Sequence, residues 1–287
     1  MPCPICKKSR HLRLHAYELS EFCFYLDNTS IYEKNNRRTN QKVSITAETD
    51  VVGKWLRLGA DLNSVDVAFE SHQSISAFAC DTHYEMLEDE SRLISEYSTA
   101  ITRFIYICNA MEELYRFVEK HYSGGNLYDA SVKCCKILSN LKASSYPNNF
   151  SHFCNNFDVK FKRFINRNGI DLNEEESGAG RYLHSVRELR NLMLHGKFPL
   201  SVAYDIPQDS NSSSFEMITL LNSAIRVQLL VTQALLFEFN NGINSRKYHD
   251  LNIMIQEDQD GDLSSFGVDY LRHLHEESDF SLSSIEW

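Results

Sequence analysis

The strongest constraint on the fold of this chain is a long run of apolar residues that recur at helical spacing from residue 85 onward. Intervals of three and four residues place one apolar stripe along an amphipathic α-helix. The residues at this spacing are Leu93, Ile94, Tyr97, Ile101, Phe104, Ile105, Cys108, Met111, Leu114, Tyr115 and Val118. The segment Ser123-Gly124-Gly125 then predicts the end of this helix, because glycine and serine favour turns.

Four further stretches show the same helical period. They cover residues 128–142, 157–166, 181–195 and 215–240. Segments that carry Gly, Pro, Asn or Ser separate them, as expected of loops between helices. The sequence therefore predicts a mainly α fold in which residues 85–241 form a helical bundle.

Residues 1–84 show a different pattern, in which apolar residues alternate with polar ones. A period of two predicts short β-strands. The residues at this spacing are Leu12 and Leu14, Val43 and Ile45, and Val65, Val67 and Phe69. Residues 28–40 are polar and rich in Asn and Arg, so we expect a loop or a long hairpin tip there. The prediction is a small β-containing module ahead of the bundle.

Charge is distributed unevenly along the chain. The net charge of −10 argues against a protein that coats nucleic acid by bulk electrostatics. Residues 246–287 hold ten acidic and three basic residues, whereas residues 1–60 hold ten basic and six acidic ones. We therefore expect residues 242–287 to form a loosely attached acidic tail with a short helix near 268–275. The N-terminal module keeps enough positive charge to bind a polyanion.

The expected cellular location follows from the cysteines and from the first residues. The chain has eight cysteines, and its N-terminus MPCPICKKSR has no apolar leader, which together point to a reducing compartment. The longest apolar run, residues 217–237, contains Asn222, Arg226, Gln228 and Gln233, which are unfavourable in a bilayer. We therefore expect a soluble, cytoplasmic protein whose apolar run is a core helix and not a membrane span.

Two pairs of potential metal ligands flank the N-terminal module. They are Cys3 and Cys6 at its start and Cys80 and His83 at its end. Four S and N ligands in this arrangement predict a tetrahedral, structural Zn²⁺ site that clamps the module to the long helix. Four protein ligands leave no open position for catalysis. Two alternatives stay open: a redox pair at Cys3 and Cys6, or an unrelated buried Cys80 and surface His83. Spare candidate ligands are His11, His15 and Cys23.

A short segment at the end of a predicted helix carries the residues best suited to catalysis. It contains Arg190, Asn191 and His195, followed by Gly196 at the expected C′ position. Asn191 and His195 are four residues apart and share a helix face, whereas Arg190 lies roughly 140° from His195 around an ideal helix. The two would converge only if the last turn unwinds or if two such helices meet in a dimer.

These residue types suit metal-independent cleavage of RNA. A histidine with a pKa near neutrality exchanges protons with the ribose 2′-OH and the leaving 5′-oxygen, and an arginine stabilises the phosphorane. Such chemistry leaves a 2′,3′-cyclic phosphate. The spacing alone is weak, because Arg10 and His15 show it as well. A simpler alternative is that Arg190 and His195 only complement the dipole at the end of their helix.

The stretch Arg190-Asn191-Leu-Met-Leu-His195 resembles the R-x4-6-H signature of the HEPN superfamily (higher eukaryotes and prokaryotes nucleotide-binding), and the helix 104–115 is similar to one that many members carry upstream. The resemblance covers about residues 85–240. It implies a bundle of four to five helices, a homodimer with a composite active site and metal-independent ribonuclease activity. Glu112 matches the acid that orients the Arg or His. Many members, including the Abi-like and ApeA-like branches, act in phage defence, abortive infection or toxin–antitoxin systems.

Two functions are therefore weighed. The first is a homodimeric endoribonuclease that cuts cellular RNA and has an antitoxin or sensor partner. In this enzyme His195 would act as acid and base, and Arg190 would bind the phosphate. Asn191 and Glu112 would position these two catalytic side chains. The alternative is a non-catalytic, zinc-containing HEPN-like binding or scaffold protein. The predicted domains are residues 1–84, 85–241 and 242–287.

One more helix carries a feature relevant to RNA. Its basic residues are Lys160, Lys162, Arg163 and Arg167. They form a stripe that suits either contact with an RNA backbone or a solvated face. Its aromatic residues at helical spacing are Phe157, Phe161 and Phe164, and we expect them in the core.

Overall fold

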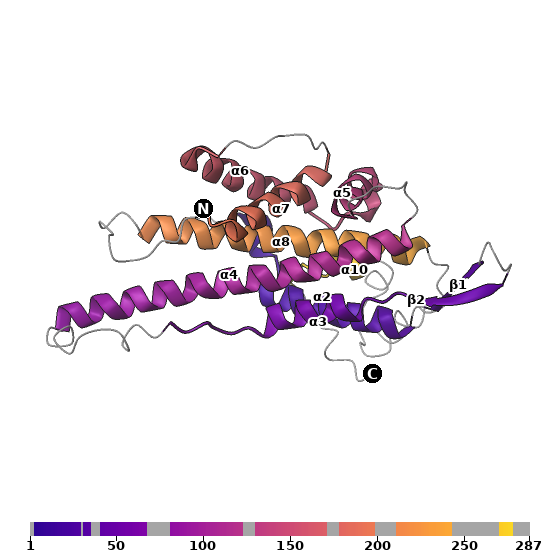
Figure 1. The fold of residues 1–287 in the computed structure, drawn as a ribbon, viewed down its shortest axis with the longest axis horizontal. Coiled ribbons are helices and arrows are strands. Elements are labelled where there is room, and N and C mark those ends of the chain that lie inside the picture. Colours follow the sequence, from indigo (N-terminus) through magenta and orange to yellow (C-terminus); the bar gives the residue numbers. More distant parts are fainter. Residues whose placement is uncertain are drawn as a thin grey trace.

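The computed structural model describes residues 3–29, 31–35, 41–67, 81–122, 130–170, 178–198, 211–242 and 270–277. These residues fold mainly into helices that pack around a common axis (Figure 1). The prediction of a mainly α helical bundle is confirmed. The division into domains at residues 84 and 241 stays a prediction.

The helices and strands follow one another in chain order as α1 (Pro4–Lys7), α2 (Leu12–Thr29), β1 (Ile31–Asn35), β2 (Lys42–Thr46), α3 (Asp50–Asp61), α4 (Asp81–His121), α5 (Ala130–Asn140), the 3₁₀ turn η3 (Ala143–Ser145), α6 (Phe150–Asn168), α7 (Gly180–Leu194), α8 (Asn211–Gly242) and α10 (Tyr270–His273). The five helices expected from residue 85 onward correspond to α4 to α8. The short helix expected near residues 268–275 is α10.

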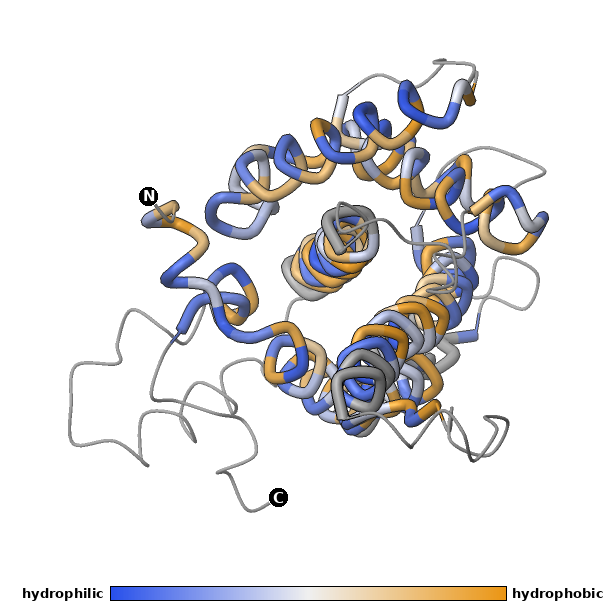
Figure 2. Tube along the Cα trace, turned by 90° about the vertical axis from the view of Figure 1, so that its left-hand side faces the viewer, coloured by the Kyte–Doolittle hydropathy of each residue, from blue (hydrophilic) through white to orange (hydrophobic). Residues whose placement is uncertain are grey.

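Helix α8 is the centre of the bundle. It contacts α2, α4, α5, α6, α7 and α10, and in the end-on view one helix lies in the middle of the others (Figure 2). Its segment Ser214–Phe239 is long and apolar enough to cross a membrane by length and composition, but 83% of its most apolar window is buried. Such burial fits the core helix of a soluble protein. The polar Arg226 and Gln233 on this helix must therefore find partners inside the protein.

The other helices form two layers around α4 and α8 (Figure 1). Helices α5, α6 and α7 cover one side, and α2 and α3 cover the other. One cluster of buried side chains joins both layers, and it includes Leu19 of α2, Leu56 of α3, Phe104 of α4 and Leu230 of α8. The N-terminal helices therefore pack onto the same core as the predicted bundle.

The β-containing N-terminal module is not confirmed, because helices make up most of this region. Leu12 and Leu14 lie in α2 and not in a strand. The apolar residues that α2 buries include Ala16, Leu19, Phe22, Cys23 and Leu26, which recur at helical spacing. This longer helical period outweighs a single pair of apolar residues two positions apart. The strand expected at Val43 and Ile45 exists as β2, which pairs with β1 in an antiparallel hairpin.

The strand expected at Val65, Val67 and Phe69 is wrong for residues 65–67, and Phe69 lies outside the described residues. In the part of the chain that the structure describes, residues 65–67 have no strand partner, and their backbone lies along α4 instead. The N–H of Val65 donates to Oγ1 of Thr99 at 2.9 Å, and the N–H of Val67 donates to Oγ of Ser95 at 3.2 Å. Helix side chains thus satisfy the backbone groups that a sheet would otherwise pair.

The described part of the C-terminal region is docked and not loose. The N–H of Arg10 donates to the carbonyl of His275 at 2.8 Å, and the N–H of Glu277 donates to the carbonyl of Lys8 at the same distance. Leu271 and Leu274 are buried in the core. Residues 270–277 therefore hold the N-terminal segment against the bundle. The rest of the predicted acidic tail lies outside the described residues.

A chain of buried hydrogen bonds connects α8 to both of these segments. Arg226 Nη1 donates to His15 Nδ1 at 2.8 Å. The proton of a neutral His15 ring must then lie on Nε2, which is 2.9 Å from Oε1 of Gln233. Nε2 of Gln233 donates to Nδ1 of His275 at 3.2 Å and to the carbonyl of Leu271. Burial lowers the pKa of His15 far below its ordinary value and that of His275 to about 4, so both rings are neutral.

Candidate functional site

The end of α7 has a defined geometry. His195 caps the helix, and Gly196 follows with φ of +67°, a conformation that suits glycine. The N–H of Lys197 donates to the carbonyl of Leu192 at 2.9 Å, and that of Gly196 donates to Met193 at 3.2 Å. These two bonds make a Schellman motif, so the prediction of glycine at the C′ position is confirmed. The motif fixes the backbone of His195 while its side chain stays exposed.

The structure joins Arg190 of α7 to Glu112 of α4. Arg190 Nη1 lies 2.6 Å from Glu112 Oε1, and the two side chains are 33% and 42% exposed. The pair lies beside the buried Cys108. Burial raises the pKa of the Cys108 thiol to about 12, although the positive charge of Arg190 acts to lower it. An arginine held by a single carboxylate oxygen keeps other N–H groups for a phosphate. Two residues that lie 78 positions apart are thus brought together at the surface.

Arg190 and His195 do not meet within one chain. The N–H of His195 donates to the carbonyl of Asn191 at 3.0 Å, as an ordinary helical bond. The Asn191 amide donates to Glu188 Oε1 at 3.4 Å. Among the described residues, the ring of His195 makes no hydrogen bond, and nothing links it to Arg190. The helix does not unwind enough to bring them together, as expected from their angular separation on α7.

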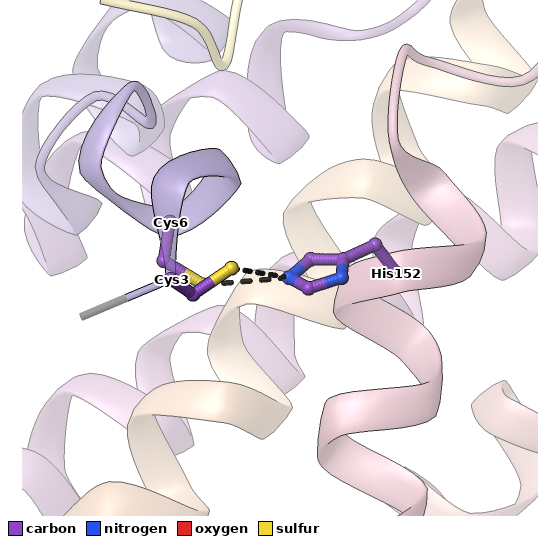
Figure 3. Close-up of side chains that lie close together, drawn as sticks. All are labelled: Cys3, Cys6 and His152. Atoms are coloured by element: carbon purple, nitrogen blue, oxygen red, sulfur yellow. Dashed lines mark hydrogen bonds between the residues drawn. The ribbon is translucent and has the colours of Figure 1, made fainter. Parts of the chain in front are cut away.

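A second candidate site lies at the N-terminus. Sγ of Cys3 is 3.4 Å from Nε2 of His152, and Sγ of Cys6 is 3.5 Å from the same atom (Figure 3). All three ligand atoms lie within 4.8 Å of one another. In a tetrahedral zinc site, Zn–S and Zn–N bonds of about 2.3 and 2.0 Å place sulfur and nitrogen about 3.5 Å apart. The spacing of these three atoms therefore fits zinc.

The local backbone prepares the two cysteines for a metal. Cys3 is the N-cap of α1, and Pro4 occupies the first helical position. Backbone N–H groups of Cys6 and Ile5 lower the pKa of the Cys3 thiol, as expected of the knuckle that a Cys-Pro-x-Cys sequence forms. Burial raises the pKa of the Cys6 thiol. A bound cation would favour both thiolates.

His152 is a ligand candidate that the sequence did not reveal. It lies in the first turn of α6, 146 residues from Cys6. Cys154 follows it by two positions in the sequence but is buried and does not belong to the cluster. Cys80 lies outside the described residues. Of His83 the structure describes the backbone, which lies in the first turn of α4. The predicted pairing of Cys80 and His83 with Cys3 and Cys6 stays a prediction.

Comparison of the chain with family models, with curated proteins and with solved structures finds no match.

Proposed function

We propose that the chain is a metal-independent endoribonuclease of the HEPN type. The Arg190–Glu112 ion pair carries this proposal, because it joins the residues that the resemblance names as catalytic arginine and orienting acid. The pair lies at the end of α7, next to an exposed histidine, on a mainly helical bundle. An ion pair that is this exposed to solvent contributes little to folding stability, so stability alone does not account for it.

Each residue has a defined role in the proposed reaction. His195 takes the proton from the ribose 2′-OH, and the alkoxide oxygen attacks the adjacent phosphorus. Arg190 stabilises the negative charge of the phosphorane, while Glu112 holds the guanidinium in place. The protonated His195 then gives its proton to the 5′-oxygen, which leaves as an alcohol, and the product carries a 2′,3′-cyclic phosphate. Asn191 positions the end of α7 next to the scissile bond.

The proposed active site is composite and forms in a homodimer. Within one chain the His195 ring does not contact Arg190, so a second α7 helix is needed to bring the two functions together. Leu194, next to His195, is 64% exposed, and a second copy of α7 would cover it. Each of the two sites would then combine Arg190 of one chain with His195 of the other.

The proposal is tested by incubating the purified protein with end-labelled tRNA and mRNA in EDTA. The wild type should cut and leave 2′,3′-cyclic ends, and H195A should lose 10²- to 10⁴-fold in rate, the usual contribution of an acid–base group. His184 lies on the same helix, so H184A is the matched control and should cut as the wild type does. Cleavage by H195A at the wild-type rate would refute the proposal. Binding of RNA without cleavage would favour the scaffold.

We also propose that Cys3, Cys6 and His152 hold a structural zinc ion. Two thiolates and a neutral imidazole balance the charge of Zn²⁺, and the site would tie the N-terminus to α6. The fourth ligand comes from outside this set, and Cys80 and His83 are the sequence candidates. Zinc at this place contributes cross-linking and no chemistry to the cleavage step.

Metal analysis of protein purified without chelator tests the zinc site. About one Zn per chain is expected for the wild type. H152A should lose the metal and unfold at lower temperature. His184 of α7 is not among the candidate ligands, so H184A is the control that should keep the metal. Loss of zinc from C80A as well would identify the fourth ligand. Full zinc content in H152A would remove His152 from the site.

The biological setting is proposed on the resemblance. A ribonuclease of this type would act in the cytoplasm, in phage defence, abortive infection or as a toxin, with an antitoxin or sensor protein as its partner. Expression of the wild type should then slow growth, and H195A should relieve this effect. Equal toxicity of both proteins would speak against a ribonuclease toxin.

A further inference from the structure

A groove between α6 and α8 combines positive charge with an exposed aromatic ring. It encloses about 310 Å³. The wall residues used below are Lys160, Arg163, Phe164 and Arg167 of α6 and Phe215 and Glu216 of α8. The groove belongs to neither of the two sites described above.

The charges of this groove favour an anionic ligand. Arg163 is exposed and makes no ion pair with any residue that the structure describes. Lys160 lies deeper and donates to Oγ of Ser223 at 2.7 Å. Arg167 pairs with Glu216 at 2.9 Å, which neutralises the acid in the wall. Two positive charges, those of Lys160 and Arg163, therefore remain for an anion.

Phe215 is the aromatic element of the groove. It is 67% exposed, although most other positions of α8 up to Phe239 are buried. A large apolar side chain that points to solvent beside arginines is typical of surfaces on which a nucleic-acid base stacks. The expected core residues Phe157, Phe161 and Phe164 are buried, as predicted, so they do not serve this purpose.

The groove is connected to the end of α7 through aromatic packing. The ring of Phe198 lies 5.5 Å from that of Phe164, which forms part of the groove wall. Phe198 is only three residues beyond His195. This contact joins one wall of the groove to the segment that directly follows His195.

We infer that this groove binds single-stranded RNA, with phosphates on Arg163 and Lys160 and a base stacked on Phe215. A single strand fits better than a duplex, because a paired base cannot stack on a side chain. The inference rests on the proposed function and extends it, since it assigns the path along which the substrate reaches His195.

The experiment measures binding separately from cleavage. A fluorescent single-stranded RNA with 2′-O-methyl groups cannot be cut, and its anisotropy reports affinity for the full-length protein in EDTA. R163E and F215A should each weaken binding about tenfold. R163E should also make the affinity less sensitive to salt, because about one counterion fewer is released on binding. Lys136 is exposed on α5, outside the groove, so K136E is the matched charge-reversal control and should bind as the wild type does.

The outcomes separate the two proposals. If R163E and F215A bind the RNA as tightly as the wild type does, the proposal that the groove binds RNA is wrong, even if cleavage depends on His195. Binding that needs Arg163 and Phe215 supports the groove, even if no RNA is cut and the nuclease proposal fails. Equal affinity for a duplex of the same length overturns the single-strand preference. Circular dichroism of each variant checks that a loss of binding does not come from unfolding.

Discussion

At the scale of single residues, the pairing of Arg190 with Glu112 is the contact on which the catalytic proposal depends. The two residues come from different helices and are 78 positions apart. The motif and the upstream helix were recognisable in the sequence, and they named both partners. Both α4 and α7 pack on α8, and this arrangement brings the two side chains together, so only the folded chain shows their contact.

Replacement of Glu112 by glutamine tests this contact. E112Q keeps the shape of the side chain but removes its charge, so Arg190 loses its fixed orientation. We expect single-turnover cleavage to slow about tenfold, because misplaced groups lose much of their effect. The free energy of unfolding should change by less than about 1 kcal/mol, since the pair is partly exposed. An unchanged cleavage rate would show that Glu112 does not position Arg190.

The buried histidines predict a dependence of stability on pH. His275 has a folded pKa of about 4, chiefly because burial disfavours its charged form; Glu276 raises this pKa, whereas Arg226 and His273 lower it. In the unfolded chain a histidine titrates near 6.5. Between these values the unfolded state binds the proton and the folded state does not. The stability is therefore complete above pH 6.5 and is lost as the pH falls toward 4.

As the pH falls from 6.5 to 4, the titration of His275 alone should lower the free energy of unfolding by about 3 kcal/mol. Urea denaturation at pH 7.5 and at pH 5 measures the trend, and His15 should add to it because its pKa is also lowered by burial. In H275Q the group that titrates is gone, so the difference between the two pH values should shrink. An identical difference in H275Q and the wild type would contradict this account.

At the scale of elements, helix periodicity located α4 to α8, whereas short alternating patterns misplaced strands. The difference lies in the number of residues that agree. A helix of four or more turns repeats its apolar spacing many times. The alternating pattern repeats only once at Leu12 and Leu14 and only twice from Val65 to Phe69. Extended segments such as residues 65–67 also form on a helix surface, where Ser95 and Thr99 satisfy the backbone. Alternation alone does not distinguish these two environments.

The start of α7 depends on close contact with α5. A Cβ atom at Gly180 would lie 2.4 Å from the backbone oxygen of Cys135, which cannot move aside as a side chain can. G180A should therefore destabilise the protein by about 3 kcal/mol, as overpacking does. At Gly196 no atom lies within 4 Å of such a Cβ. G196A should cost only about 1 to 2 kcal/mol, from its left-handed backbone.

Thermal or urea unfolding of the two variants measures this difference. G196A should also disturb the cap that fixes His195, so its cleavage rate should fall while most of its stability remains. Comparable stability of G180A and the wild type would show that α5 and α7 separate more easily than the structure indicates.

At the scale of the whole molecule, the question is whether two chains share each active site. Both R190A and H195A should be inactive alone. In a mixture, half of the dimers combine one chain of each kind, and each such dimer contains one intact pair of Arg190 and His195. The mixture should therefore regain about a quarter of the wild-type activity if each chain contributes to the other's site. If the mixture recovers no cleavage activity although the subunits have exchanged, Arg190 and His195 must act within the same chain.

The sequence by itself determined helices α4 to α8, the short α10, the cap at Gly196 and the residues of the two candidate sites except His152. These features depend on spacings of a few residues, which a helix converts directly into shared faces and ends. The tertiary structure alone decided that α2 and α3 join the core of the bundle and that residues 270–277 dock on the N-terminus. It also brought His152 to Cys3 and Cys6. Such contacts between residues more than a hundred positions apart arise from the packing of apolar helix faces, which local spacing does not encode.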